Sequence, residues 1–318
     1  MSVATKNTKT LGVFIPEFWS KKLNKKLDDV GVMKDCVNRK YEGEIKKCGD
    51  QVNIMEVGDI TINNHNSANA LTYQTLTATD LALLIDQEKY FAFKINDVTK
   101  VQANQELTDK YISRAAFAIE MVKDTFLLSK RADVHSDNVV PTMTLTKDNV
   151  YQLFVELKKR LRKANAISQK GKDANGRRPW AVVNPDIESL ILLSPEMKDR
   201  GSALVDKNIR EGTVYDFCGF DVMVATNMKS VTESGTTSVE VLAGIEDAIT
   251  FAGQISKVEH LRDKDGFNDL VRGLYVYGGK TLLPKGLAKC SCTLSTVAQS
   301  NGTSDTDSDS DTDTDTDG

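Results

Sequence analysis

The hydrophobic period of the chain changes between residues 87 and 129, and this change limits what the chain can fold into. Apolar and polar residues alternate from residue 90 to 95, as in a half-buried strand. From Leu107 to Ser129 the apolar positions instead recur at helical spacing, in one stripe of Tyr111, Ala115, Ala118, Ile119, Val122 and Phe126. The pattern predicts a strand that leads into a long helix.

The junction between this strand and this helix is a candidate active site, because many α/β enzymes place their chemistry where a strand ends. Asp97 and Lys100 lie there. No partner base, glycine loop or metal ligand accompanies them. We therefore interpret Asp97 and Thr99 as turn or capping residues before the helix, and the junction as a mechanical hinge.

The residues before the junction contain strands but few large core residues. Alternating segments at 36–45 and 51–57 precede a stretch rich in Gly, Asn and Ser, and two further strands follow at 81–86 and 89–95. So small a core would not fold alone. We predict a projecting hairpin that completes its packing on a neighbouring subunit. Residues 1–15 are polar and are predicted to form an extended arm, followed by a short helix from Pro16.

Helices and then strands follow the junction. A second helix is predicted over 150–164, with Thr146 as candidate N-cap and a basic end formed by Lys158, Lys159, Arg160, Arg162 and Lys163. The helix dipole explains that basic end without a ligand. Asn184 and Pro185 are predicted to cap a short helix after a buried strand, and strands are predicted over 219–227, 238–245, 248–253, 256–262, 269–284 and 287–295. Without regular β-α-β alternation, this order indicates an α+β fold.

Charge is unevenly distributed along the 318 residues. The last fifteen residues contain seven aspartates and no basic residue; subtracting them from the 45 acidic residues leaves 38, against 41 basic residues. A nearly neutral body with an acidic tail is unlike a sequence-reading DNA-binding protein. The sequence also predicts no secretory signal, no transmembrane helix and free thiols at its five cysteines, which is typical of a cytoplasmic protein.

Candidate catalytic and ligand-binding residues do not form a recognisable site. His65, His135 and His260 lack a second histidine at metal spacing. Cys290 and Cys292 are predicted to point to opposite faces of a strand, which argues against a shared metal. "GGKT" at residues 278–281 resembles the end of a phosphate-binding loop, but Leu274 replaces its first glycine and Pro284 prevents the helix that it needs. The aspartate-rich tail lacks the Gly and Glu of a calcium loop. We predict no catalytic, cofactor-binding or metal-binding residue.

Several segments together resemble the major capsid proteins of tailed bacteriophages, which have the Hong Kong 97-like fold. "IPEFWSKKL" and "VNRKYEGEIKKCGDQVNI" resemble the arm entering the extended loop, and "KYFAFKINDVTKVQANQELTDKYISRAAFAIEMVKD" resembles the strand that returns into the spine helix. "LTKDNVYQLFVELKKRLRKANA" and "RPWAVVNPDIESLIL" resemble the entry to the axial domain. "GFDVMVATN", "GIEDAITFAGQISKVEHLR" and "LVRGLYVYGGKTLLPKGLA" resemble its closing strands. The likeness extends to about residue 297.

The resemblance implies a domain plan. It comprises an N-terminal arm at 1–38, an extended β-hairpin loop (E-loop) at 39–88, and a peripheral domain with the spine helix at 89–146 and 249–274. An axial domain at 147–248 and 275–297 and a disordered acidic tail at 298–318 complete it.

The resemblance also implies a shell subunit without enzymatic activity or cofactor. It would form pentamers and hexamers around double-stranded DNA, bound without sequence specificity, and would be located in the virion after assembly in the host cytoplasm. The expected partners are other copies of the chain, a separate scaffolding protein, a portal protein and a decoration protein, with no membrane. Some relatives cross-link a Lys to an Asn, but that pair cannot be placed in this sequence.

Two alternatives remain open from the sequence. An encapsulin-type compartment shell shares the fold but encloses enzyme cargo. A nucleotide-binding enzyme would use the region of Lys280. For the tail, repulsion between its aspartates and DNA phosphates predicts that it faces outward or lies near a subunit boundary.

Overall fold

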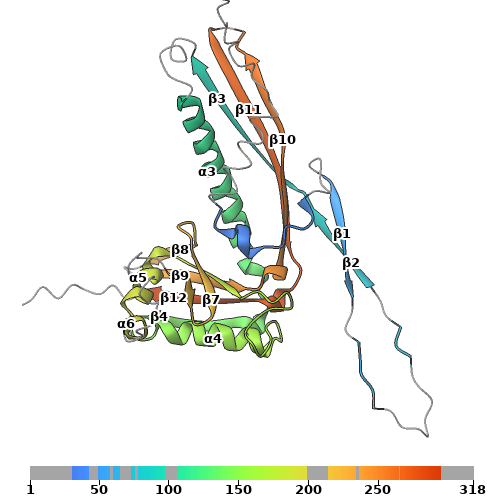
Figure 1. Ribbon diagram of the computed structural model, residues 1–318, viewed down its shortest axis with the longest axis vertical. Coiled ribbons are helices and arrows are strands. Elements are labelled where there is room, and N and C mark those ends of the chain that lie inside the picture. The colour runs from blue at the N-terminus through green and yellow to red at the C-terminus, as the bar shows by residue number, and fades with distance from the viewer. Residues whose placement is uncertain are drawn as a thin grey trace, which may run out of the picture.

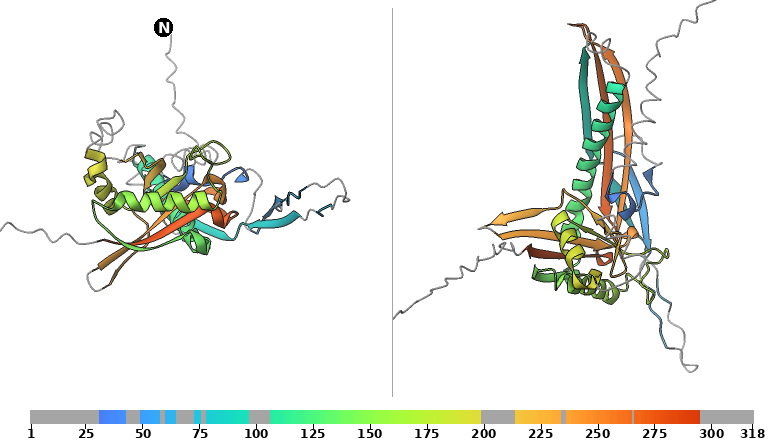
Figure 2. Two further views of the ribbon diagram at one scale, coloured as in Figure 1. Left: turned by 90° about the horizontal axis from the view of Figure 1, so that it is seen from below. Right: turned by 60° about the vertical axis from the view of Figure 1, so that its left-hand side comes forward.

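The computed structural model describes residues 31–42, 49–57, 60–64, 73–75, 78–96, 106–198, 214–233, 236–264 and 266–294. The described chain forms an upright sheet with a helix beside it, a broader body at its foot, and a two-stranded hairpin that projects away from both (Figure 1). Figure 2 shows the upright sheet and the body from two further directions. The predicted helix from Pro16 and residues Asp97, Thr99 and Lys100 of the junction lie outside the described residues.

The upright part is a three-stranded antiparallel sheet in the order β10-β11-β3, with helix α3 alongside (Figure 1). Its elements are β3 (Gln87–Asn96), α3 (Glu106–Ser129), β10 (Ile249–Arg262) and β11 (Asn268–Thr281). The predicted strand and long helix on either side of the junction are both confirmed. The segments predicted as two strands at 248–253 and 256–262 are one strand, β10, with an irregularity between Ile255 and Lys257.

The body is built on a seven-stranded sheet in the order β4-β12-β9-β5-β7-β6, and β8 pairs with β9. Helix α4 packs against this sheet. Its strands and helices are β4 (Val139–Leu145), α4 (Val150–Lys163), β5 (Trp180–Val183), α5 (Pro185–Leu193), α6 (Pro195–Lys198), β6 (Asp216–Phe217), β7 (Phe220–Val224), β8 (Ser230–Glu233), β9 (Thr236–Gly244) and β12 (Leu287–Leu294).

The hairpin consists of β1 (Gln51–Val57) and β2 (Ala78–Leu84), which pair antiparallel from Gln51↔Leu84 to Val57↔Ala78. The base of the hairpin is buried: Val52, Ile54, Leu83 and Ile85 pack with Ala252 of β10 and Val276 of β11. This cluster is separate from the main hydrophobic core. A small core of its own therefore joins the hairpin to the upright sheet.

The first turns of α5 and α4 test the two helix caps that the sequence predicted. Asn184 accepts a hydrogen bond from Ile187 N at 3.0 Å, and Pro185 occupies the first turn of α5, as predicted. The prediction of Thr146 as the cap of α4 is wrong, because that helix begins at Val150 after Asn149. The side chain of Asn149 instead bonds backwards, to the Thr146 amide and the Thr144 carbonyl, and it closes the turn that precedes the helix.

One other sequence-based prediction needs correction. The strand expected over 36–45 is absent from the described residues of that range, where a 3-10 turn (Met33–Cys36) and one bridge between Asn38 and Thr250 lie instead. Strand β4 belongs to the seven-stranded sheet, and β11 runs without a break from Asn268 to Thr281 in the three-stranded sheet.

Candidate assembly surface

The hairpin beyond its buried base exposes large apolar side chains. Ile62 is 93% exposed and Tyr73 is 87% exposed, and Met55 and Ile60 are also largely open to solvent. A hydrogen bond of 2.9 Å from Thr61 N to the Gln74 side chain links the two legs of the hairpin. Several exposed apolar side chains on one projection indicate a surface that another protein covers. We call Met55, Ile60, Ile62 and Tyr73 the hairpin apolar set.

The joint between hairpin and upright sheet depends on a glycine. Gly278 lies in β11 directly under the end of β2. A Cβ added to Gly278 would overlap the carbonyl oxygen of Leu84 and lie 2.9 Å from the Cα of Ile85. Both neighbours are backbone atoms, which cannot rotate away. Lys280 Nζ donates to the Ala82 carbonyl at 3.1 Å and adds a second link between β11 and β2.

Replacing Gly278 with alanine is expected to lower the free energy of unfolding by about 1–3 kcal/mol, because the added methyl overpacks a backbone-to-backbone contact. The matched control is Gly279→Ala. Its added Cβ would meet the ring edge of Phe126 at 3.0 Å, and a side chain can yield a few tenths of an ångström. Chemical denaturation of the two variants measures the difference. Equal losses would show that the close approach at Gly278 has no special role.

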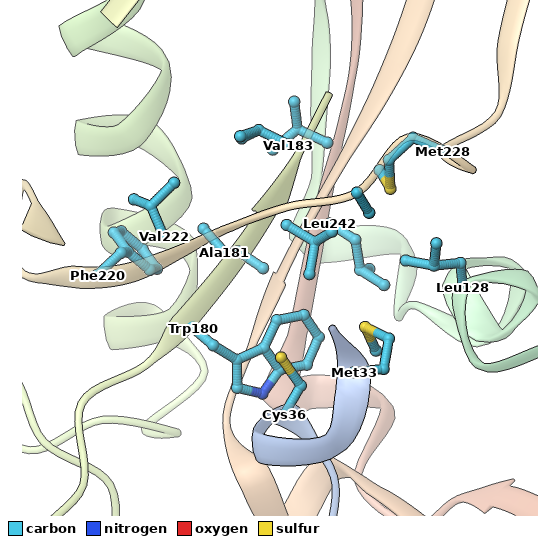
Figure 3. Close-up of a cluster of buried hydrophobic side chains, with 14 of the residues drawn as sticks. Met33, Cys36, Leu128, Trp180, Ala181, Val183, Phe220, Val222, Met228 and Leu242 are labelled. Atoms are coloured by element: carbon cyan, nitrogen blue, oxygen red, sulfur yellow. The ribbon is translucent and has the colours of Figure 1, made fainter. Parts of the chain in front are cut away.

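The segment before the hairpin is anchored on helix α3 by a buried carboxylate. Asp124 accepts hydrogen bonds from Val32 N at 3.0 Å and from Met33 N at 3.2 Å. Met33 and Cys36 then enter the main core beside Trp180 and Leu242 (Figure 3). The anchored segment thus lies between the upright helix and the body and contacts both.

An ion pair lies one helical turn from this anchor, and both of its partners are almost fully buried. Lys123 Nζ lies 2.5 Å from one carboxylate oxygen of Glu120 and 2.7 Å from the other. The ammonium group also lies 5.7 Å from the centre of the Phe251 ring. Burial raises the pKa of the Glu120 carboxyl, and the charge of Lys123 opposes that rise. We call Glu120, Lys123 and Asp124 the anchor cluster.

Asp124 of the anchor cluster is expected to make the free energy of unfolding depend on pH. Burial raises the pKa of Asp124 above its unfolded value of about 3.9, although its two backbone hydrogen bonds oppose the rise. The folded state therefore holds this proton more tightly, so the stabilisation is complete below the unfolded pKa and is lost as the pH rises through the folded pKa. The unfolding free energy of the native chain, relative to Asp124→Asn, is expected to increase as the pH falls from about 7 to 4. Urea titrations across that range measure it, and a difference that stays constant or decreases would contradict the expectation.

Comparison with solved structures relates this architecture to known shells. A chain of Mycobacterium phage Che8 is 28% identical with a TM-score of 0.60, and the match covers 82% of this chain and 90% of that one. The capsid of cyanophage P-SCSP1u is 12% identical with a TM-score of 0.61 over 92% and 93% of the two chains. The capsid of Ralstonia phage GP4 is 9% identical with a TM-score of 0.54 over 92% and 97%. No protein-family model and no curated protein matches the sequence.

The chain resembles the major capsid proteins of tailed phages and shares their Hong Kong 97-like fold.

The residues that suggested catalysis or ligand binding in the sequence have structural roles wherever the structure describes them. "GGKT" ends strand β11, and Gly278 and Gly279 are strand residues. The His135 side chain accepts a hydrogen bond from Asp137 N and begins a short 3-10 turn. His65, the side chain of His260 and the tail lie outside the description. Within the described part, no cluster of three or more His, Cys, Asp or Glu could hold a metal ion.

The prediction that Cys290 and Cys292 point to opposite faces of a strand is wrong. Residues two apart on a strand share a face, and both Cys290 and Cys292 are buried, with their sulfur atoms 3.6 Å apart. The thiol–thiol hydrogen bond raises the pKa of Cys292 and lowers that of Cys290. Among the described cysteines, Cys36, Cys218, Cys290 and Cys292 are free thiols, as predicted.

The sequence alone predicted no role for the residues of the hairpin apolar set or of the anchor cluster. The stretch that contains Ile60, Ile62 and Tyr73 is otherwise polar. These isolated apolar residues could have indicated a surface that another subunit covers. For the anchor cluster, the i,i+3 spacing of Glu120 and Lys123 is ordinary on a solvated helix face. No helix in the described part of the chain is long and apolar enough to span a membrane.

Proposed function

We propose that this chain is the coat subunit that assembles, as pentamers and hexamers, into the icosahedral shell around double-stranded phage DNA. The observation that carries the proposal is the match, over most of both chains, to phage capsid structures. The projecting hairpin with its exposed apolar set supports it, because such a surface needs a partner subunit.

The two sheets correspond to the domain plan inferred for the subunit. The upright sheet with α3 serves as the peripheral domain, with α3 as its spine helix. The seven-stranded sheet with α4 and α5 serves as the axial domain, and the hairpin serves as the E-loop. We infer an arm in residues 1–38 and an acidic tail in residues 298–318. The role is structural, with no catalytic, cofactor-binding or metal-binding residue proposed.

The subunit's partners follow from this role. We propose other copies of the same chain as the main partner, a separate scaffolding protein during assembly, and a portal protein at one vertex. A decoration protein and the packaged DNA, held without sequence specificity, are further partners. The proposed location is the virion, after assembly in the host cytoplasm. The encapsulin alternative is disfavoured because the similar structures above come from phages.

Electron microscopy tests the proposal directly. The full chain, expressed with its scaffolding protein, is expected to form closed shells or isolated pentamers and hexamers. Particles purified from infected cells should contain DNA. A chain that stays monomeric under all these conditions would contradict a shell role, and shells that contain one enzyme and no DNA would support the compartment alternative.

Replacing Ile60, Ile62 and Tyr73 with serine is expected to reduce the yield of shells at least about tenfold, since loss of about 1.4 kcal/mol of contact weakens association by that factor. The unfolding free energy should change by less than about 0.5 kcal/mol, because these side chains are exposed within the subunit. The control replaces Thr61, Asn63 and Asn64 with serine, three exposed polar positions of the same hairpin. The yield of shells is measured by sedimentation for both variants. Equal yields would contradict a docking role for the hairpin.

A further inference from the structure

A basic pocket of about 300 Å³ lies at the C-terminal end of helix α4. Lys158 and Arg162 of the helix, Lys170 and Lys172 of the loop that follows, and Arg178 and Asp216 line it. The helix dipole accounts for cations on α4 itself. It does not account for Lys170 and Lys172, which a separate loop brings back over the end of the helix.

Backbone hydrogen bonds fix that loop. Ser168 N donates to the Lys172 carbonyl at 2.7 Å, and Gly171 N donates to the Ser168 carbonyl at 2.9 Å. Gly171 lies in the left-handed region at φ 74°, which favours glycine there. The opposite wall is a turn in which Cys218 and Gly219 also have positive φ. The pocket is therefore shaped by the fold of the backbone.

Most of the positive charge in the pocket has no counterion among the described residues. Arg178 is the exception, because it pairs with Asp216 and lies 3.7 Å from Asp221. Lys158 Nζ donates to the Cys218 carbonyl at 2.7 Å, a neutral acceptor. Arg162 similarly donates to the Gln169 carbonyl at 3.3 Å. Lys158, Arg162, Lys170 and Lys172 thus form a concave surface of four uncompensated cations, which suits an anionic ligand with several charges.

The chain itself carries an anion of this kind. Residues 305–317 place an aspartate at every second position. The last described strand, β12, is parallel to β4, and α4 follows β4 after a short turn and runs back along the sheet. The pocket therefore lies roughly one helix length, about 21 Å, from the end of β12. Residues 295–304 can span up to about 33 Å, so the first aspartates can reach it.

We propose that this basic pocket binds the acidic C-terminal tail of the same subunit. Covalent attachment gives the tail an effective concentration on the order of millimolar at the pocket, which favours it over free anions. The opposite charges attract at short range, and salt should weaken the contact. Bound in this way, the tail would keep the pocket cations from nucleic acid phosphates.

Lysine acetylation rates test the proposal in the full-length chain. The comparison variant replaces all seven aspartates, Asp305 to Asp317, with asparagine. Lys170 and Lys172 are expected to react about threefold or more faster in this variant at low salt, and the difference should vanish at about 0.5 M NaCl. Lys147 and Lys285, exposed lysines outside the pocket, are the controls. Unchanged rates at Lys170 and Lys172, or equal increases at the control lysines, would overturn the proposal.

A photo-cross-linking residue in place of Ser310 identifies where the tail binds. Cross-linked peptides are expected within residues 158–178 of the same chain, and Lys170→Glu with Lys172→Glu should abolish them. The matched control, Lys147→Glu with Lys285→Glu, should preserve them. Cross-links to another region, or cross-links that join two chains, would overturn binding within the subunit. Pocket lysines that become protected only in DNA-filled particles would instead identify nucleic acid as the ligand.

Discussion

Replacing Lys123 with methionine is expected to lower the free energy of unfolding by about 3–5 kcal/mol, the usual cost of leaving a buried charge without its partner. Glu120 and Lys123 are only 2% and 5% exposed, so water cannot solvate the remaining carboxylate. Methionine keeps most of the length and apolar stem of lysine. The measured loss of stability in Lys123→Met therefore comes mainly from the missing charge, and only to a small extent from a cavity.

Two further variants separate the charge from the packing. The double variant Glu120→Gln with Lys123→Met removes both charges, and it should recover at least about 2 kcal/mol of the loss, since an uncharged pair carries a smaller desolvation cost. Lys159→Met breaks the pair with Glu156, which has the same i,i+3 spacing on α4 but is partly exposed. That change should cost less than about 1 kcal/mol. Denaturant unfolding of all three variants is the measurement, and equal losses from Lys123→Met and Lys159→Met would contradict the burial argument.

The second large effect is expected from Asp124→Leu, which should destabilise the subunit by about 2–4 kcal/mol. Leucine accepts no hydrogen bond, so the amides of Val32 and Met33 lose their acceptor, and its larger side chain adds a cost of overpacking. Each unsatisfied buried donor costs about 1–3 kcal/mol. The loss should also free the anchored segment, because these two bonds fix its entry into the core.

The control for this prediction is Asp124→Asn, whose amide oxygen still accepts one of the two bonds. It should cost about half as much as leucine. Hydrogen exchange at Val32 and Met33 provides a second measurement, with faster exchange expected in the leucine variant than in the asparagine variant. Unchanged protection at both amides would show that another group holds the segment.

The sequence predicted the elements whose partners lie close along the chain. The period of the apolar stripe identified α3 to within a residue, and Asn184-Pro185 identified the start of α5. Strand β4 was missed. It contains Pro141, a residue unfavourable inside a sheet, but β4 is an edge strand, where proline is tolerated.

The anchor cluster could not be predicted, because its burial depends on distant residues. Glu120, Lys123 and Asp124 alternate with apolar positions as on any solvated helix face. They become buried only when Val32 and Met33, about ninety positions earlier, fold over them. The basic pocket shows the same limit. The sequence explained the cations of the helix by the helix dipole alone, whereas Lys170 and Lys172, half of the uncompensated charge, come from the following loop.

The place of β12 in the sheet has a consequence for biosynthesis. This strand is the last described element of the chain, yet it lies between β4 and β9, which are both translated earlier. The ribosome must therefore release residues 287–294 before the seven-stranded sheet can close. Until those residues emerge, β4 and β9 lack the strand that joins them in the finished sheet.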